Sequence, residues 1–285
     1  MHNDSVCKVK TSIKTRLNRS LIAGASAERL ITDGFTTHYP LLSAAPPAPA
    51  APPRDEDVLV AAPGHTVRAL SPLRRWLGRG SMFVLSGAQA QRLLCVEGAP
   101  ENQHGALLDL GAGDGAVSGR FAHLFERKYA TEISASMRNV LSSKGYTILD
   151  ADEWWRSSED FSCVSMLNLL DRCIRPKSML RQARAAMLTR PHAKMRLLIA
   201  LVLPYKPYVE ATPDHKPEER LPIEGTTVEE QACSFVQWME ASGWSLQAWT
   251  RVPYLCEGDF AQSYYWLDDT VFVFTPVPLE NEKDV

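Results

Sequence analysis

The chain has 285 residues, of which 45% are hydrophobic and 22% charged, enough for one substantial core and a small appendage. A formal net charge of −2 gives no electrostatic case for binding nucleic acid or a membrane surface, and no apolar run approaches the length of a transmembrane helix. The six cysteines show no CxxC spacing, which favours buried or free thiols over a disulfide framework, and no metal site is expected.

The first 57 residues differ in composition from the rest. Residues 1–43 carry six Lys or Arg against three acids, and residues 43–57 form the Pro/Ala-rich stretch SAAPPAPAAPPRDED. The first part fits either an organellar transit peptide or a disordered basic tail, and the second fits an extended linker. Folded structure is therefore expected to begin after residue 57.

Residues 58–105 are predicted to form a helical extension around a glycine-rich turn at 78–80, which could serve as a lid. From residue 106 onward, strands and helices alternate. Strands are predicted at 106–110, 128–133, 146–149, 161–167 and 194–204, and helices at 116–125, 134–144, 177–189 and 228–242. Ser134 suits a helix N-cap, and Gly145 and Gly243 suit helix ends.

This alternation predicts an α/β fold with a mostly parallel sheet and right-handed crossovers. The last two predicted strands, 245–252 and 270–275, have no convincing helix between them, so they are expected to form an antiparallel hairpin at the end of a seven-stranded sheet. The acidic, aromatic segment between them, including Asp268 and Asp269, is predicted to be a loop, either solvated or able to hold a His-rich peptide. The main domain is expected to span residues 106–278, with an acidic tail at 279–285.

The stretch LLDLGAGDGAV places Gly111, Gly113 and Gly115 directly after a short strand and before a predicted helix. Glycines there allow a tight turn and close approach of a ligand to the backbone, which is typical of a nucleotide-cofactor site. The spacing also satisfies the looser GxGxxA pattern, so the glycines alone do not separate a dinucleotide from another adenosine cofactor.

Two acids favour one class of cofactor. Glu132 ends the second strand, where an acid can accept hydrogen bonds from ribose hydroxyls in both NAD and S-adenosylmethionine sites. Asp109 lies inside the first strand, where it can meet the loop N–H groups or a cationic amino-acid tail. Because Asp109 and Asp114 would repel a pyrophosphate but not a sulfonium with an ammonium group, the charges favour S-adenosylmethionine.

Further polar residues follow the next strands. Asn168 and Asp171 come just beyond the strand at 161–167, facing the cleft where open α/β sheets bind ligands. Asp152 follows the third strand and is either a contact to the adenine amino group or a solvated loop acid.

Several longer segments resemble one family. The segments LGRGSMFVLS, LLDLGAGDG, YATE, LNLLDRC, IALVLPYKPYVE and PYLCEGD are similar to the DREV-type protein-histidine N1(pros)-methyltransferases, and the resemblance covers about residues 77–277. It implies a class I, Rossmann-like fold and methyl transfer from S-adenosylmethionine, with S-adenosylhomocysteine as product, to the N1 (pros) nitrogen of histidine in His-x-His proteins. It further implies that Glu132, Asn168 and Tyr254 hold the cofactor and that Asp171 faces the substrate imidazole, so Asp171 and Asn168 are the catalytic candidates.

The sequence is also compatible with other functions. They are a methyltransferase with a different protein or small-molecule acceptor, an NAD(P) oxidoreductase, and a non-catalytic module that holds His-rich partners. The chain beyond residue 203 is short for the separate substrate domain that an oxidoreductase needs. A monomer is expected, in the cytoplasm or, by the family resemblance, in the endoplasmic reticulum or mitochondrion.

Overall fold

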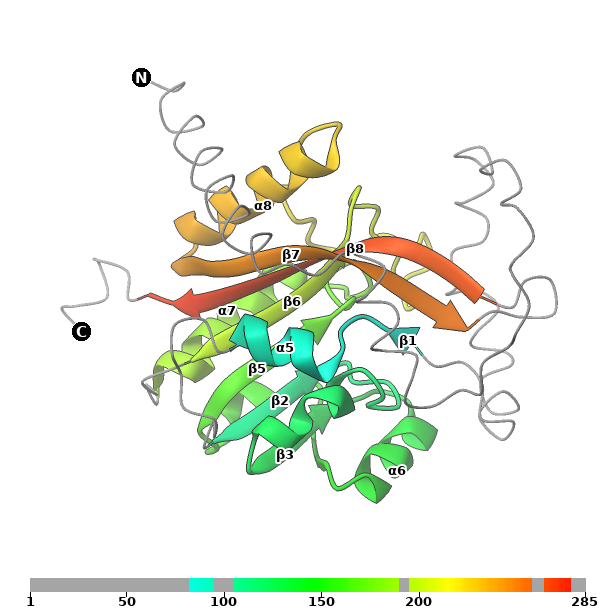
Figure 1. Ribbon diagram of the computed structural model, residues 1–285, viewed down its shortest axis with the longest axis vertical. Helices are drawn as coiled ribbons and strands as arrows, with labels where there is room; N and C mark the ends of the chain where they lie inside the picture. Colours follow the sequence, from blue (N-terminus) through cyan, green and yellow to red (C-terminus); the bar gives the residue numbers. More distant parts are fainter. Residues whose placement is uncertain (1–81, 95–104, 190–194, 258–263, 278–285) are drawn as a thin grey trace.

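A computed structural model describes residues 82–94, 105–189, 195–257 and 264–277. Within these residues the chain forms one eight-stranded sheet in the order β1-β7-β8-β6-β5-β2-β3-β4 (Figure 1). The five strands from β4 to β6 are parallel, while β8, β7 and β1 each pair antiparallel with their neighbours. This confirms the predicted α/β fold with an antiparallel C-terminal hairpin. The strand beyond the expected seven is the two-residue β1.

Most elements lie within two or three residues of their predicted positions. The strands are β1 Met82–Phe83, β2 Ala106–Leu110, β3 Arg127–Thr131, β4 Thr147–Leu149, β5 Phe161–Leu167, β6 Arg196–Val202, β7 Trp244–Glu257 and β8 Tyr264–Pro276. The helices are α5 Gly87–Leu94, α6 Ala135–Ser143, α7 Pro176–Thr189 and α8 Val228–Ala241, with the 3₁₀ turns η1 Ser118–Arg120, η2 Ala122–Leu124 and η3 Trp154–Arg156.

The core consists of two apolar layers, one on each face of the sheet. Alternate residues of β6 divide between them: Leu197 and Ile199 pack with α7 and α8, whereas Leu198 and Ala200 pack with α5, η1, η2 and α6. This follows from the two-residue period of a strand, and it explains why the central strands are apolar at nearly every position. In Figure 1, α5 crosses in front of the sheet and α7 lies behind it.

The prediction of a helix at 116–125 is wrong. In its place stand the two short 3₁₀ turns, with the bonds Phe121 N–H to Ser118 O and Leu124 N–H to Phe121 O. Phe121 has φ −127° and ψ 0°, which interrupts any continuous helix, and Gly119 lowers helix propensity at the same place. Phe121 and Phe125 are nevertheless buried, and Val117 and Leu124 are partly buried, because turns with three residues per repeat can present nearly the same face.

The two C-terminal strands are longer than predicted. They are 14 and 13 residues long and pair with each other from Trp244–Pro276 to Glu257–Tyr264. Asp268 and Asp269 therefore lie inside β8, and their prediction as loop residues is wrong. The pairing explains the extension, because each strand satisfies the backbone groups of the other along its whole length.

Helix ends agree with the capping expectations in part. Ser134 occupies the N-cap of α6, but its hydroxyl bonds to that of Ser136 rather than capping the helix. Gly145 and Gly243 follow α6 and α8 with φ of +81° and +83°. Thr227 and Glu230 form a complete capping box on α8, which the sequence prediction had not identified.

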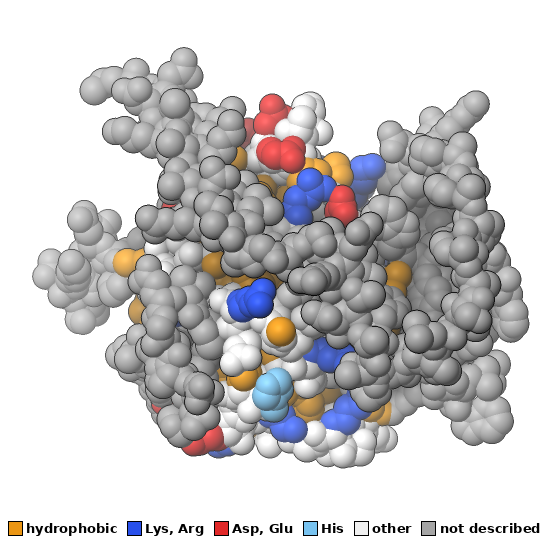
Figure 2. All heavy atoms as spheres, viewed as in Figure 1, with side chains coloured by type: hydrophobic (Ala, Val, Ile, Leu, Met, Phe, Trp, Pro, Cys, Tyr) orange, Lys and Arg blue, Asp and Glu red, His pale blue; other side chains and the backbone are white. Residues whose placement is uncertain are grey.

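No helix of the described residues is long and apolar enough to cross a membrane. On the face in Figure 2, the Lys and Arg side chains that are coloured are scattered and do not gather into one patch. The predicted tail at 1–57, the turn at 78–80, the segment 95–104 and the tail at 279–285 lie outside the described residues.

Candidate cofactor and active site

The glycine turn after β2 stands where the carboxyl ends of the parallel strands meet. Gly111, Gly113 and Gly115 have φ of +65°, +58° and +70°, which confirms that the turn needs residues able to adopt the left-handed conformation. A side chain at Gly111 or Gly115 would come within 2.7 Å of Leu169 or Leu141. By contrast, a side chain at Gly113 would meet no atom within 4 Å, so the space beside this glycine is open.

Glu132 organises this turn. Its Oε2 accepts a hydrogen bond from the Gly113 N–H at 2.9 Å, and its Oε1 accepts one from the Ser134 N–H at 2.8 Å. Thr131 holds the beginning of the turn, with its Oγ1 and carbonyl oxygen accepting from the Gly111 and Ala112 N–H groups. A carboxylate oxygen can accept more than one bond, so Glu132 retains acceptor capacity for ribose hydroxyls.

Asp109 lies in β2, two residues before the turn begins. It is 2% exposed, and its Oδ1 accepts a hydrogen bond from the Ser165 hydroxyl at 2.6 Å. Burial raises the pKa of Asp109 to about 6, opposed by hydrogen bonds from Ser118 and Ser165. The N–H groups of the turn bond to Thr131, Glu132 and residues of the turn itself, so the expected contact between them and Asp109 is not what the structure shows. Contact of Asp109 with a cofactor remains a prediction.

Asn168, which is half-buried directly after β5, is hydrogen-bonded to Asp269 of β8, which pairs with the last residue of β6. The Asn168 Nδ2 donates to the Asp269 Oδ2 at 2.8 Å, although the two residues are 101 positions apart. Asp269 is fully buried, and burial raises its pKa to about 7, with Asn168 opposing the shift and Asp171 adding to it. The sequence analysis placed Asp269 in a loop that could hold a peptide and gave it no part in the cofactor site, whereas it lies inside β8.

Asp171 lies beside this pair. It is 7% exposed, its carbonyl oxygen accepts from the Tyr208 N–H at 2.8 Å, and its Oδ2 lies 3.3 Å from the Arg172 Nε. Burial raises the pKa of Asp171, and the Arg172 guanidinium opposes that effect. The ion pair with Arg172 occupies only one carboxylate oxygen.

Three acceptor oxygens in this cluster have no hydrogen-bond partner among the described residues. They are the Oδ1 atoms of Asn168, Asp171 and Asp269, all buried. A buried acceptor without a donor costs free energy, and sites of this kind are where ligands bind. The cluster therefore suits a ligand that brings N–H donors or positive charge.

The other predicted site residues, Tyr254 and Asp152, differ in how far they are buried. Tyr254 is 8% exposed, and its hydroxyl donates to the Met82 Sδ, which ties β7 to β1. It stands two residues beyond Val252, which pairs with Asp269, and so lies past the carboxyl end of the neighbouring parallel strand β6. Asp152 is exposed and its N–H bonds to Asp150 Oδ1, so the structure does not bring it into contact with the cluster.

Ile133 was not identified from the sequence. It directly follows Glu132 and is 67% exposed, an unusual position for a large aliphatic side chain. Its exposure beside the ribose-binding candidate gives an apolar surface for a flat ring such as adenine. The available signal was an isoleucine immediately after a strand-ending acid.

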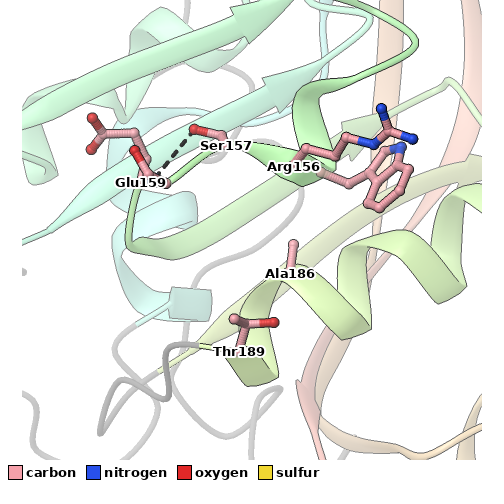
Figure 3. A pocket seen from close by; sticks show the side chains of 7 residues that line it. Arg156, Ser157, Glu159, Ala186 and Thr189 are labelled. Atoms are coloured by element: carbon pink, nitrogen blue, oxygen red, sulfur yellow. Dashed lines mark hydrogen bonds between the residues drawn. The ribbon is translucent and has the colours of Figure 1, made fainter.

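A pocket of about 270 Å³ lies elsewhere, between the segment after η3 and the C-terminal end of α7 (Figure 3). Arg156, Ser157, Glu159, Ala186 and Thr189 line it. Glu159 precedes β5 and pairs with Arg127 at the start of β3, which places this pocket at the amino end of the strands. None of the predicted site residues lines it, so it is separate from the cluster.

A sequence model described as DREV methyltransferase matches residues 69–276. The chain belongs to the DREV methyltransferase family. The resemblance seen in the sequence is thereby confirmed, and the cofactor of this DREV protein is S-adenosylmethionine. The buried acceptors, the open space beside Gly113 and the acceptor capacity of Glu132 fit such a cofactor, which carries an ammonium group, a sulfonium and a ribose.

Among solved structures, the DREV protein is similar to a precorrin-6y C5,15-methyltransferase from Geobacter metallireducens, with 15% identity, 66% and 85% of the two chains covered, and a TM-score of 0.40. It is also similar to the N-methyltransferase NodS from Bradyrhizobium japonicum with S-adenosylhomocysteine, with 14% identity, 67% and 85% coverage, and a TM-score of 0.40. A DhpI–SAH complex matches at 14% identity, 75% and 91% coverage, and a TM-score of 0.43. Likeness at this level says nothing about the substrate.

Proposed function

We propose that this DREV methyltransferase transfers the methyl group to the N1 (pros) nitrogen of histidine in proteins that carry a His-x-His motif. The observation that carries the proposal is Asp171, a buried carboxylate with one oxygen paired to Arg172 and the other, Oδ1, without a partner among the described residues. The DREV-type resemblance supplies the identity of the acceptor, and the chemistry of Asp171 is consistent with it.

The reaction needs selection of one ring nitrogen more than it needs a strong base. Imidazole has an ordinary pKa of about 6.5, so much of it is already neutral and nucleophilic near pH 7. A carboxylate that accepts the N–H of the tele nitrogen fixes the tautomer in which the pros nitrogen keeps its lone pair. We assign this role to the free Oδ1 of Asp171.

The same contact stabilises the product side of the reaction. As the pros nitrogen forms its bond to the methyl carbon and the carbon–sulfur bond breaks, positive charge develops on the ring. A buried carboxylate interacts more strongly with that charge than an exposed one would. The Arg172 guanidinium opposes the rise of the Asp171 pKa that burial causes, and so favours the charged form of this carboxylate.

Cofactor binding is assigned to residues around the turn. When bound, S-adenosylmethionine supplies the electrophilic methyl group. Glu132 holds the ribose, Ile133 packs against the adenine, and Asn168 and Tyr254 lie on the side of the methionine moiety. Gly113 leaves the space through which the cofactor approaches the backbone.

The test uses purified protein, labelled S-adenosylmethionine and a short His-Ala-His peptide. Amino-acid analysis that separates the two methylhistidine isomers should show label only in 1-methylhistidine. A matched peptide with both histidines replaced by alanine controls for methylation elsewhere. Label in 3-methylhistidine, or no labelled histidine despite retained S-adenosylhomocysteine binding, would refute the proposed acceptor and leave the methyl-donor site in place.

A further inference from the structure

Asp269 is the most deeply buried acid of the cluster, yet the chemistry proposed above gives it no role. It lies in β8 between β6 and β7, where its backbone pairs with Val202 on one side and Val252 on the other. Three strands therefore determine where its carboxylate points. Asp268, the preceding residue, is exposed and pairs with Arg251.

We propose that Asp269 is a positioning residue, which holds the side-chain amide of Asn168 so that the Asn168 Oδ1 accepts a hydrogen bond from the ammonium group of the cofactor's methionine moiety. This inference requires that the methyl donor binds at the proposed cofactor site. It does not require that the methyl acceptor is histidine.

The geometry of Asn168 supports this role. Its backbone is held in the left-handed conformation, with φ +54°, and its N–H donates to the Ala200 carbonyl oxygen at 2.9 Å. The side chain keeps its two torsions, and rotation about the last one exchanges the oxygen and the nitrogen. A carboxylate at 2.8 Å from Nδ2 accepts from N–H and repels the amide oxygen, so it selects one of these two orientations.

The selected orientation leaves the Asn168 oxygen free to accept a hydrogen bond from a ligand. With Nδ2 committed to Asp269, the Asn168 Oδ1 faces away from that carboxylate and is buried without a partner among the described residues. Polarisation by the carboxylate increases the negative charge on this oxygen. The neighbouring Asp171, whose Oδ1 is assigned to the substrate imidazole, adds negative charge to the cluster.

The charge of the cluster identifies the ligand group. Burial raises the pKa of both Asp171 and Asp269, so a positive charge bound here would stabilise their ionised forms. The cation with which the structure pairs this cluster is Arg172, through the Asp171 Oδ2. An anion or a lone acceptor would be disfavoured there, whereas a primary ammonium brings positive charge and three N–H donors. Leu169, next to Asn168, packs against the Gly111 position, so the cluster adjoins the glycine turn that holds the rest of the cofactor.

The test compares two ligands by calorimetry. S-adenosylhomocysteine carries the ammonium group, and 5′-methylthioadenosine shares its adenosine part but lacks the amino-acid part. In Asp269→Ala, affinity for S-adenosylhomocysteine should fall about ten- to hundredfold, while affinity for methylthioadenosine stays within about twofold. Asp269→Asn can accept from the Asn168 Nδ2 but can also donate to its Oδ1, so it should lose less affinity than Asp269→Ala without matching the wild type. The exposed neighbour variant Asp268→Asn should match the wild type.

A double-variant cycle shows whether Asp269 acts through Asn168. Asn168→Gly removes the amide and tolerates the left-handed backbone, so it should also lose S-adenosylhomocysteine affinity selectively. Adding Asp269→Ala to Asn168→Gly should then change the affinity little. Full additivity of the two losses would overturn the proposal.

Two further outcomes would overturn it. Equal loss of affinity for both ligands would mean that Asp269 serves the fold, and unchanged affinity for S-adenosylhomocysteine would mean that the amide faces another group. If Asp269→Ala does not fold, Asn168→Gly and Asp269→Asn decide the matter. The proposal requires selective loss of S-adenosylhomocysteine affinity in both variants, with the smaller loss in Asp269→Asn. All these measurements are made without a peptide, so failure of the histidine proposal does not affect them.

Discussion

Two variants of the glycine turn are predicted to differ in opposite ways in stability and in cofactor affinity. Gly113 and Gly115 both adopt left-handed backbone conformations, with φ of +58° and +70°. They differ in what a side chain would meet: nothing within 4 Å at Gly113, but the Leu141 Cδ2 at 2.7 Å and Tyr146 at 3.5 Å at Gly115. Replacing each by alanine therefore adds the same methyl group in two different surroundings.

The expected magnitudes follow from these contacts. Both variants carry the cost of a left-handed alanine, about 1–2 kcal/mol. Gly115→Ala adds overpacking against Leu141, which is fully buried, and this costs about 1–3 kcal/mol more. The reduction in unfolded-state entropy is the same for both variants, so it cancels in the comparison.

The assays are thermal unfolding and binding of S-adenosylhomocysteine. At roughly 2–4 °C per kcal/mol for a domain of this size, Gly115→Ala should melt clearly below Gly113→Ala. Affinity should follow the opposite order, because a methyl group at Gly113 occupies the open space assigned to the cofactor. A steric conflict of about 1–3 kcal/mol corresponds to roughly a five- to hundredfold loss.

Two results would refute this reasoning. Equal melting temperatures would show that the Leu141 contact relaxes without cost. Wild-type affinity in Gly113→Ala would show that the cofactor does not use the space beside that glycine.

Four further predictions test other parts of the molecule. Asp171→Asn should lower turnover of a His-Ala-His peptide by about 10²–10⁴ while S-adenosylhomocysteine affinity persists, and equal loss of both would make Asp171 structural. Peptide methylation by the wild type should rise between pH 5.5 and 8, because the imidazole loses its proton at about pH 6.5. A single-turnover rate that does not change with pH would contradict a neutral imidazole as the nucleophile. Burial raises the pKa of Asp109 from 3.8 to about 6, so the folded state binds this proton more tightly and stability falls as the pH rises between those values. Asp109→Asn should thus gain stability relative to the wild type from pH 4 to pH 7, by at most about 3 kcal/mol in denaturant titrations, and no pH-dependent difference would refute the shift. Thr227→Ala should remove the capping box of α8 and lower the free energy of unfolding by about 0.5–2 kcal/mol, whereas Thr227→Ser should not.

Much of the fold was predictable because its signals are local. Most of the parallel strands are recognisable in the sequence as short apolar runs, and the turn at 111–115 needs glycines that no other residue replaces easily. The acid at the end of the next strand, Glu132, was identified for the same reason, and the structure brings it to the Gly113 N–H.

The prediction failed where a local pattern allowed two outcomes. Residues 116–125 have the apolar spacing of a helix, but the same side chains reach the core from two 3₁₀ turns. The lengths of β7 and β8 depend on each other, because a strand continues for as long as its partner supplies hydrogen bonds.

The sequence by itself determined the parallel sheet, the glycine turn and the acids at the strand ends, since each depends on residues a few positions apart. Only the tertiary structure decided that Asp269 meets Asn168 while Asp268 meets Arg251. Two adjacent acids look alike in a sequence, but a strand sends them to opposite faces, and the register of β8 against β6 and β7 determines which one is buried.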